Sequence, residues 1–376
     1  MKTKGKAQGH RFLFIFGTRP EAIKMAPLVK TLRTIGSVQV CVTGQHRDML
    51  DQVLEFFSIV PDYDLNIMAE NQSLFRVTTK SLKLLERVID ESKPDLIIVQ
   101  GDTTTAFAGA LTGFYNKIKV AHVEAGLRSF KKYSPFPEEI NRILVGHIAD
   151  YHFAPTKKAK DNLIRENIPS KNIFMVGNTV IDALLMGMKI IKRNEKKYYD
   201  YFKFLDYSKK ILLVTGHRRE SFGKPFENIC DALKEIAKEH VEIVYPVHLN
   251  PHVRRHVYPI LSGIRNIHLI DPLNYPSLIW LMNKSYLILT DSGGIQEEAP
   301  SLGKPVLVLR DVTERTEGIE AGTGILVGTH KKKIVGSTRM LLSNRGVYRT
   351  MARRKNPYGD GTAALRIREI IKKIMN

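Results

Sequence analysis

Short apolar runs alternate with amphipathic stretches along the first half of the chain. The apolar runs have the length of strands and lie at Phe12–Phe16, Val38–Thr43, Leu96–Gln100, Val120–Val123 and Tyr151–Ala154. The stretches between them space their apolar residues as helices do, at Pro20–Ile35, Ser73–Ser92, Thr103–Tyr115 and Glu138–Ala149. Val-, Ile- and Leu-rich strands separated by helices predict a parallel sheet that is covered by helices on both faces.

The same pattern restarts in the second half. Its predicted strands are Ile211–Thr215, Glu242–Pro246, Ile267–Ile270, Tyr286–Thr290 and Val306–Leu309, and its predicted helices are Phe226–Glu239, Tyr275–Asn283 and Ile295–Leu302. Residues 192–210 are rich in Lys and Tyr and only weakly periodic, which predicts a linker. We therefore expect an α/β protein with two Rossmann-like, doubly wound domains that face a cleft, comprising residues 1–190 and 191–361. A final helix, 362–376, is expected to pack back on the first domain.

Composition excludes several other classes of protein. A chain of 376 residues is long for a single core, and no apolar run approaches the ~18 residues that a membrane span needs. The first ten residues are basic and polar and contain no apolar signal core. Two cysteines, Cys41 and Cys230, argue against a disulfide framework or a zinc site. These features predict a cytoplasmic protein that does not insert into membranes.

The net charge of +20 at pH 7 raises the question of nucleic-acid binding. The basic residues are dispersed, however, and no helix-turn-helix, zinc-finger or RNA-binding signature accompanies them. We interpret most of them as solvated helix faces that attract polyanions without specificity. No nucleic-acid partner is expected.

Glycine and charged residues follow several of the predicted strands. They lie at Gly17–Glu21, Gly101–Thr105, Glu124–Gly126, Gly216–Glu220 and Asp291–Gly294. Ligands of open α/β sheets bind beyond the carboxyl ends of the strands, so these segments are expected to share one site.

The segment Leu289–Ser301 has the features of a phosphate site. Gly293 and Gly294 allow the backbone to approach a ligand closely, and the N-terminus of the following helix favours an anion. Glu298, one turn later, is placed to accept hydrogen bonds from sugar hydroxyls. Arg19 and Lys24 can add positive charge for phosphate. A plain strand–helix turn is the structural alternative.

Acidic residues near the strand ends suggest proton transfer. Asp102 precedes three threonines and by itself is typical of a helix N-cap. Glu124 ends an apolar strand, where a carboxylate is costly unless it is partnered or functional. Glu138 and Glu139 begin a helix, and one of them is expected to face inward.

His217 heads a Gly-His-Arg-Arg cluster that is suited to a diphosphate. The twelve histidines show no metal-ligand spacing, so no metal is expected. Together these residues predict an enzyme that acts on a nucleotide-linked sugar and breaks the bond to its diphosphate. Phosphate binding without chemistry remains the alternative.

Taken in order, the motifs resemble those of the non-hydrolysing UDP-N-acetylglucosamine 2-epimerases. They are Phe16–Pro27, Val42–Arg47, Gly101–Thr105, His122–Ser129, Pro137–Arg142, Val176–Asp182, Thr215–Ser221, Asp291–Glu298 and Asn356–Gly361. The resemblance covers nearly the whole chain. It implies a fold similar to the GT-B glycosyltransferases and the interconversion of UDP-GlcNAc and UDP-ManNAc through 2-acetamidoglucal, for cell-surface polysaccharide synthesis. It also implies a homodimer that needs no cofactor and no metal.

The resemblance further implies roles for individual residues. Catalytic positions match Asp102, Glu124, Glu138 and His217, and further substrate-binding positions match Arg19, Lys24, Leu273, Leu278, Ser292, Gly293, Gly294, Glu298 and Arg315. A second, allosteric UDP-GlcNAc site matches Gln45, His46 and Gln72. Four alternatives remain: a hydrolysing relative, an epimerase of a more decorated sugar, a GT-B glycosyltransferase and a nucleotide-sugar-binding regulator.

Overall fold

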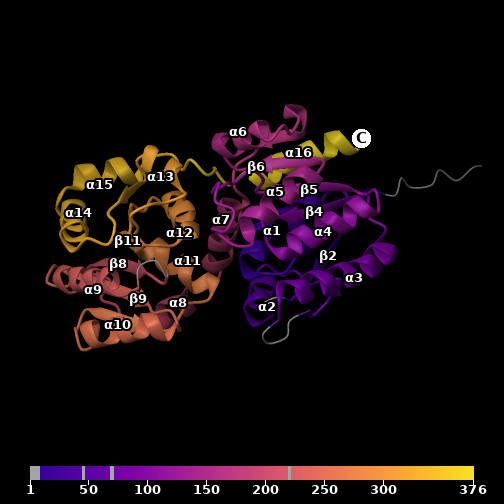
Figure 1. Cartoon of the computed structure of the whole chain (residues 1–376). Helices are drawn as coiled ribbons and strands as arrows, with labels where there is room; N and C mark the ends of the chain where they lie inside the picture. The colour runs from indigo at the N-terminus through magenta and orange to yellow at the C-terminus, as the bar shows by residue number, and fades with distance from the viewer. Residues whose placement is uncertain (1–8, 45–46, 68–71, 219–221) are drawn as a thin grey trace, which may run out of the picture. The chain divides into compact units, whose positions relative to one another are not determined.

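The computed structural model describes residues 9–44, 47–67, 72–218 and 222–376. The chain forms two compact units (Figure 1). The first extends to Met186 and also contains Gly359–Asn376, and the second is Gly187–Tyr358. The chain therefore leaves the first unit, completes the second and returns.

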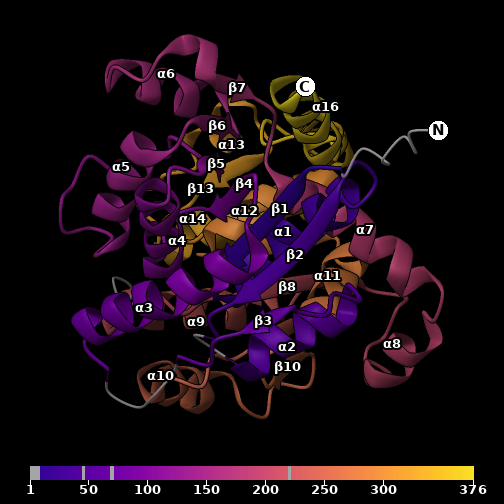
Figure 2. The same ribbon diagram turned by 90° about the vertical axis from the view of Figure 1, so that its right-hand side faces the viewer.

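The first unit is built on a seven-stranded parallel sheet with the order β3-β2-β1-β4-β5-β6-β7 (Figure 2). Its strands are β1 (Arg11–Phe16), β2 (Ser37–Val42), β3 (Tyr63–Asp64), β4 (Leu96–Gln100), β5 (Lys119–Val123), β6 (Tyr151–Ala154) and β7 (Ile173–Met175). The strand order reverses between β1 and β4. Ligands of doubly wound sheets bind at such a switch point.

Helices cover this sheet. They are α1 (Arg19–Leu32), α2 (Arg47–Phe56), α3 (Leu74–Ser92), α4 (Thr104–Tyr115), α5 (Glu138–Ile148), α6 (Lys157–Arg165), α7 (Thr179–Lys192) and α16 (Ala363–Met375). One group is formed by α1, which packs against α2 and α16, and another by α4, which packs against α3 and α5. A Cβ at Gly109 of α4 would lie 3.0 Å from Val99 of β4, so this glycine brings helix and sheet into close contact.

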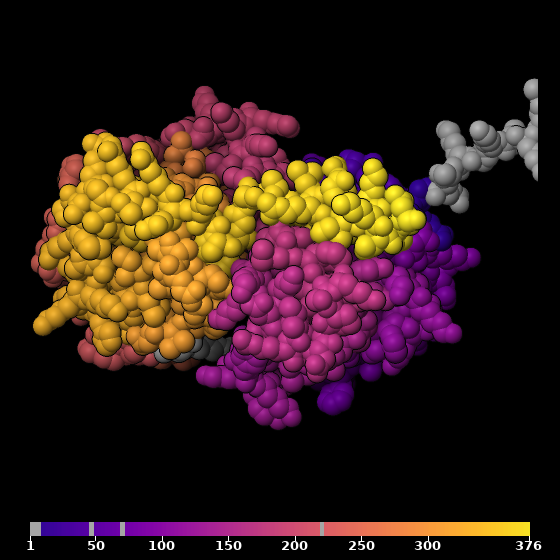
Figure 3. Space-filling view, turned by 90° about the horizontal axis from the view of Figure 1, so that it is seen from above, coloured from indigo at the N-terminus to yellow at the C-terminus, as the bar shows by residue number. Residues whose placement is uncertain are grey.

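The C-terminal helix α16 is anchored to the first unit by Asp182. The Asp182 carboxylate accepts hydrogen bonds from the backbone N–H groups of Ala363 and Ala364, at 3.2 and 2.9 Å. Ile367 and Ile371 are fully buried, and α16 lies on the surface of this unit (Figure 3, yellow). The last residues of the chain therefore contribute to the core of the first unit.

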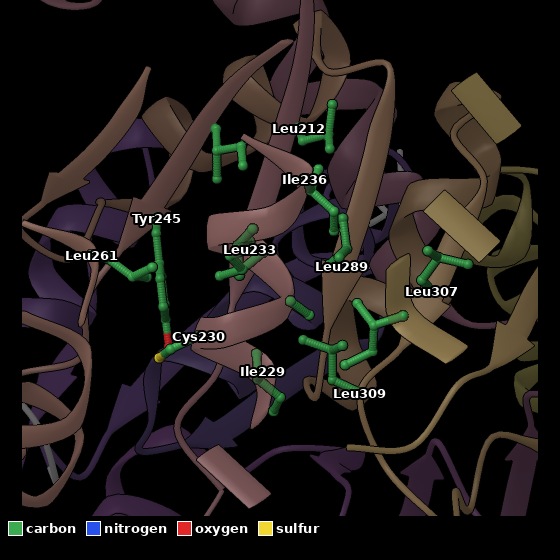
Figure 4. Close-up of a cluster of buried hydrophobic side chains, with 14 of the residues drawn as sticks. Leu212, Ile229, Cys230, Leu233, Ile236, Tyr245, Leu261, Leu289, Leu307 and Leu309 are labelled. Atoms are coloured by element: carbon green, nitrogen blue, oxygen red, sulfur yellow. The ribbon is translucent and has the colours of Figure 1, made fainter. Parts of the chain in front are cut away.

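The second unit is also built on a parallel sheet, which has six strands in the order β10-β9-β8-β11-β12-β13. Its strands are β8 (Lys210–Thr215), β9 (Val241–Pro246), β10 (Ile267–Ile270), β11 (Leu287–Thr290), β12 (Val306–Val308) and β13 (Gly324–Leu326). Its helices are α8 (Lys196–Tyr201), α9 (Lys224–Ile236), α10 (Pro251–Leu261), α11 (Tyr275–Lys284), α12 (Gly293–Glu298), α13 (Thr316–Glu320), α14 (Lys331–Ser343) and α15 (Arg345–Ala352). Leu233 and Ile236 of α9 pack with Leu212 and Leu289 of the sheet (Figure 4).

The predicted α/β class with two parallel sheets is confirmed, and each predicted strand is present within a residue or so of its expected ends. The strands β3, β7 and β13, of two or three residues each, were not predicted. Within the described residues, no helix combines the length and apolar character that a membrane crossing requires.

The prediction of a linker at 192–210 is wrong. The chain passes from one unit to the other within the continuous helix α7, and 192–210 belongs to the second unit. Two aromatic rings of this segment stack near Trp280: Phe202 with a centroid distance of 5.1 Å and Tyr198 with one of 6.0 Å. The weak periodicity arises because the segment packs around a single indole ring.

Replacement of buried and exposed residues of α16 should separate packing from helix propensity. Ile367→Ala should lower the free energy of unfolding by about 2–4 kcal/mol, because it leaves a cavity in the first unit. Leu365→Ala is the matched control, since Leu365 is 45% exposed on the same helix, and it should cost less than about 1 kcal/mol. Guanidinium unfolding followed by circular dichroism measures both. Equal losses would show that α16 does not contribute to the core as described.

Candidate functional site

Glu21 joins the turns that follow β1 and β4. Its carboxylate accepts hydrogen bonds from the backbone N–H groups of Gly17 and Thr18, at 3.0 and 2.8 Å, and from the Thr103 hydroxyl at 2.6 Å. Burial raises the pKa of Glu21, while these hydrogen bonds act in the opposite direction. Gly17 packs against the end of β2, where an added Cβ would lie 2.0 Å from the Thr43 hydroxyl. The first turn is therefore fixed, and Arg19 begins α1 directly after it.

Glu124 follows β5 and is held by one side chain from α1 and one from the loop before α7. Its Oε1 accepts from the Lys24 ammonium at 2.8 Å, and its Oε2 accepts from the Asn178 amide at 3.0 Å. Glu124 is buried and has a positive φ of 61°. The Glu124 carboxylate, which would be costly to bury without a partner, is thus paired. Lys24, whose charge was expected to serve a phosphate or to be solvated, donates to Glu124.

Asp102 is not the N-cap of α4. Thr103 occupies the N-cap position, and its hydroxyl accepts from the Ala106 N–H at 3.1 Å. The Asp102 carboxylate instead accepts from Arg142 Nε at 2.6 Å, and its backbone carbonyl accepts from the Asn141 amide at 2.9 Å. The N-cap interpretation was wrong because the next residue has its own capping hydroxyl and because α5 provides a cation.

Glu139 and Glu138 differ in their surroundings. Glu139 is buried and accepts from the backbone N–H groups of Ser129 and Phe130, at 2.9 and 2.8 Å, and from Arg142 at 3.1 Å. Burial alone would raise the pKa of Glu139, but these donors hold it below its usual range. Glu138 is partly exposed, yet its Oε2 is shielded from solvent and has no hydrogen-bond partner in the described part of the chain. Glu139 therefore stabilises the loop before α5, whereas Glu138 has an oxygen that can accept a hydrogen bond from a ligand.

Glu21, Asp102 and Glu124 lie just beyond the carboxyl ends of three adjacent strands, β1, β4 and β5. The turn after β4 is bonded to β5, because the Gly101 N–H donates to the Val123 carbonyl at 3.0 Å. His122 Nε2 lies 2.7 Å from the Gly101 carbonyl. The first unit thus places Asp102 and Glu124 after the adjacent strands β4 and β5, and Arg142 links Asp102 to α5, the helix that Glu138 begins.

In the second unit, Asp291 holds the turn after β8. Its Oδ2 accepts from the backbone N–H groups of His217 and Arg218, at 2.7 and 2.8 Å. The His217 ring is 43% exposed, and its Nδ1 lies 3.3 Å from Asp291 Oδ1. This ring is stacked on that of His248, with centroids 5.5 Å apart. A histidine and a buried carboxylate therefore lie at the ends of two adjacent strands.

The turn after β11 brings a cation to the start of α12. The Ser292 N–H donates to the Thr290 hydroxyl at 2.9 Å, and Ser292 is the N-cap residue. A Cβ added at Gly293 would lie 3.3 Å from the Arg315 guanidinium carbon. Arg315 is oriented by Glu297, whose carboxylate accepts from its Nε at 2.8 Å. The Gly293 backbone and a guanidinium thus lie side by side, an arrangement that suits phosphate oxygens.

Glu298 is buried and accepts from the Tyr275 hydroxyl at 2.9 Å. Leu273 is buried and Leu278 is partly exposed, and these two residues lie on either side of Tyr275 in the sequence. Of the expected allosteric residues, Gln45 and His46 lie outside the described residues. Gln72 donates to the Ile67 carbonyl at 2.9 Å.

Several site residues were not predicted as such. Arg142 and Asn178 position Asp102 and Glu124 from 40 and 54 residues away, and no local pattern marks such contacts. Glu21 has a local signal, since Thr18 and Glu21 have the spacing of a capping box. In the part of the chain that the structure describes, no group of three or more His, Cys, Asp or Glu side chains is arranged to hold a metal ion.

Comparisons with known proteins agree with one another. A family model described as UDP-N-acetylglucosamine 2-epimerase matches residues 31–372. The chain is similar to the UDP-N-acetylglucosamine 2-epimerase of Escherichia coli (strain K12), with 56% identity over 369 residues that cover 96% of this chain and 98% of the relative. It is also similar to a crystal structure of UDP-GlcNAc 2-epimerase from Neisseria meningitidis bound to UDP-GlcNAc, with a TM-score of 0.89, 49% identity and coverage of 96% and 100%. The Methanocaldococcus jannaschii UDP-GlcNAc 2-epimerase in complex with UDP-GlcNAc and UDP has a TM-score of 0.80, 38% identity and coverage of 96% and 99%.

Two buried histidines should make stability fall in mild acid. Burial lowers the pKa of His122 to about 3, and burial lowers that of His152 to about 4. Between the ordinary value of about 6.5 and these values, the unfolded chain binds protons that the folded chain does not. The free energy of unfolding should therefore decrease as the pH falls through this window, by up to about 1.4 kcal/mol per pH unit for each histidine.

The effect can be assigned with two variants in urea unfolding between pH 6.5 and pH 4. His122→Gln keeps a donor for the Gly101 carbonyl and should flatten the dependence of stability on pH. His240→Gln, at an exposed position, should leave the wild-type slope unchanged. A His122→Gln slope equal to that of the wild type would contradict the prediction.

Proposed function

The chain belongs to the UDP-N-acetylglucosamine 2-epimerase family, and we propose that it interconverts UDP-GlcNAc and UDP-ManNAc. Its α/β fold with two parallel sheets is GT-B-like. The observation that carries the proposal is the Glu124 carboxylate, which is buried at the carboxyl end of β5 and held by an ammonium and an amide. Such a group is suited to proton transfer on a bound sugar.

The proposed reaction is an elimination followed by an addition. A base removes the proton on carbon 2 of the sugar, and the electron pair of that bond forms a double bond between carbons 1 and 2. The bond between carbon 1 and the β-phosphate oxygen breaks, and its electrons leave with UDP. In the second step the same oxygen attacks carbon 1, and a proton is added to carbon 2 from the opposite face. No electrons are gained or lost overall.

Inversion at carbon 2 requires proton transfer on two faces of the sugar, which favours more than one acid–base group. We assign this transfer to Asp102, Glu124 and Glu138 without dividing the roles of base and acid among them. Asp102 and Glu124 each bind a cationic side chain, Arg142 and Lys24 respectively. Glu138 offers an oxygen that has no partner among the described residues. The set therefore contains carboxylates in different electrostatic settings.

The second unit is proposed to bind the nucleotide. Ser292, Gly293 and Gly294 would bind the diphosphate together with Arg315 and His217. Glu298 would accept hydrogen bonds from the ribose hydroxyls, and Leu273 and Leu278 would contact uracil. The buried position of Glu298 and the proximity of Arg315 to Gly293 support this division.

The wider context is also proposed. UDP-ManNAc made by this enzyme would feed cell-surface polysaccharide synthesis in the cytoplasm, and the enzyme would act as a homodimer. Gln45, His46 and Gln72 would form a second UDP-GlcNAc site that controls activity. The two domains proposed to carry these functions are 1–190 with 362–376, and 191–361.

Proton NMR of UDP-GlcNAc incubated with the protein in deuterium oxide tests the reaction. We expect deuterium at carbon 2 and a mixture of intact UDP-GlcNAc and UDP-ManNAc, because the abstracted proton exchanges with solvent. Stoichiometric release of free ManNAc would identify a hydrolase instead. A spectrum with no exchange and no new sugar would contradict catalysis and favour a nucleotide-sugar-binding protein.

Removal of the charge at Glu124 should abolish turnover without unfolding the chain. Glu124→Gln keeps the shape of the side chain but cannot take up a proton, so the rate should fall by about 10²- to 10⁴-fold. Glu86→Gln, at an exposed position of α3, is the matched control and should retain wild-type activity. Circular dichroism checks the fold of both. An active Glu124→Gln variant would reject the assignment.

Calorimetric titration with UDP and with 2′-deoxy-UDP tests the ribose contact. The wild type should bind UDP more tightly, by about 10-fold or more, because a charged acceptor loses a hydroxyl donor in the deoxy compound. Glu298→Gln should bind UDP more weakly and discriminate less between the two ligands. Glu320→Gln, exposed on α13, should behave as the wild type does. Unchanged discrimination in Glu298→Gln would place the ribose elsewhere.

A further inference from the structure

Asp291 is a buried carboxylate whose two oxygens differ in their hydrogen bonds. Its Oδ2 accepts the backbone N–H groups of His217 and Arg218, at 2.7 and 2.8 Å, and these bonds fix the plane of the carboxylate. Its Oδ1 has no hydrogen-bond partner in the described part of the chain, although it lies 3.3 Å from His217 Nδ1. A buried carboxylate oxygen without a donor is costly. The His217 ring is close enough to supply one after a small rotation.

A second histidine, His248, lies beside the His217 ring. His248 is stacked on His217 with an angle of 17° between the rings. The His248 Nδ1 accepts the Asn250 N–H at 3.1 Å, so this nitrogen carries a lone pair. Burial lowers the pKa of His248, and so does its proximity to His217. The described titratable or charged groups around His217 and Asp291 include His248, the adjacent Arg218 and Tyr245, whose hydroxyl donates to the Gly216 carbonyl. Among these groups, the negatively charged form of Asp291 is the one that favours positive charge on the ring.

We propose that Asp291 is a positioning residue that accepts the His217 Nδ1 proton and keeps a proton on Nε2 when a diphosphate binds. This inference rests on the proposed function. It specifies the protonation state of His217, one of the residues proposed to bind the diphosphate. When Nδ1 faces Asp291, Nε2 lies on the opposite side of the ring. A neutral ring with its proton on Nδ1 would present a lone pair to a phosphate and repel it. The doubly protonated ring donates to both anions at once.

This arrangement helps the bond between carbon 1 and the β-phosphate oxygen to break. As that bond breaks, its electron pair moves to the phosphate oxygen. The Nε2–H group then forms a charge-assisted hydrogen bond to UDP, which is stronger than a neutral one. The proton remains between the ring and the phosphate and is available again when UDP adds back, so the step consumes nothing.

Asp291→Asn separates the charge from the geometry. The amide oxygen can still accept both backbone N–H groups, and the amide nitrogen then faces His217 Nδ1. An amide N–H requires a lone pair at Nδ1, which leaves a neutral ring with its proton on Nε2. The variant should fold normally, bind UDP more weakly and lose the positive charge on the ring.

Calorimetry of UDP binding at pH 7.5, in buffers with different ionisation enthalpies, measures the predicted proton. The wild type should take up protons when UDP binds, because the second anion next to the ring favours its doubly protonated form. Asp291→Asn and His217→Gln should take up almost none. His248→Phe keeps a stacked ring and should retain the uptake, as should the exposed control His240→Gln.

Kinetics supply the second readout. The kcat of Asp291→Asn should fall by about 10- to 100-fold while its KM changes by only a few fold, because the charge acts on the departing group. Equal proton uptake in Asp291→Asn and the wild type would overturn the inference, as would UDP binding to the wild type without any uptake. A wild type that neither binds UDP nor exchanges the carbon 2 proton would instead reject the proposed function.

Discussion

A buried carboxylate that accepts hydrogen bonds from two consecutive backbone N–H groups is the interaction on which much of this structure depends. Beyond the end of a parallel strand, the backbone loses its sheet partners and must find others. Glu21 provides them for the turn after β1, Glu139 for the loop before α5 and Asp291 for the turn after β8. Asp182 does the same at the start of α16. In each case an acidic side chain fixes a segment that ordinary secondary structure leaves open.

This use of acidic residues explains why the chemistry of the site is hard to predict from composition. Glu138 and Glu139 are adjacent and identical in type, yet one is bonded to three donors and the other keeps a shielded oxygen without a partner in the described residues. Carboxylates that hold the backbone are occupied and cannot transfer protons freely. Those that contact side chains instead, such as Glu124 and Asp102, are placed by Lys24 and Arg142. The division between scaffold and site follows from which donors reach each carboxylate.

The sequence predicted the repeating architecture well, because both sheets are built from apolar runs that alternate with helices. It also indicated that glycine and charged residues gather at strand ends. It failed where a partner lies far along the chain: Arg142 removes Asp102 from the expected capping role, and Trp280 organises the segment that resembled a linker. Asn178, which holds Glu124, likewise shows no local pattern. Periodicity reports on a residue's own helix or strand, whereas these contacts depend on how elements pack.

The return of the chain to its first unit has a consequence for biosynthesis. During translation, the ribosome completes β1 to β7 early, but α16 emerges only after the entire second unit has been made. Until then, the pocket that receives Ile367 and Ile371 is empty, and the carboxylate of Asp182 lacks the two amides it will bind. A nascent chain that stalls within the second unit would therefore expose an apolar surface on an otherwise finished domain, and chaperones bind surfaces of this kind.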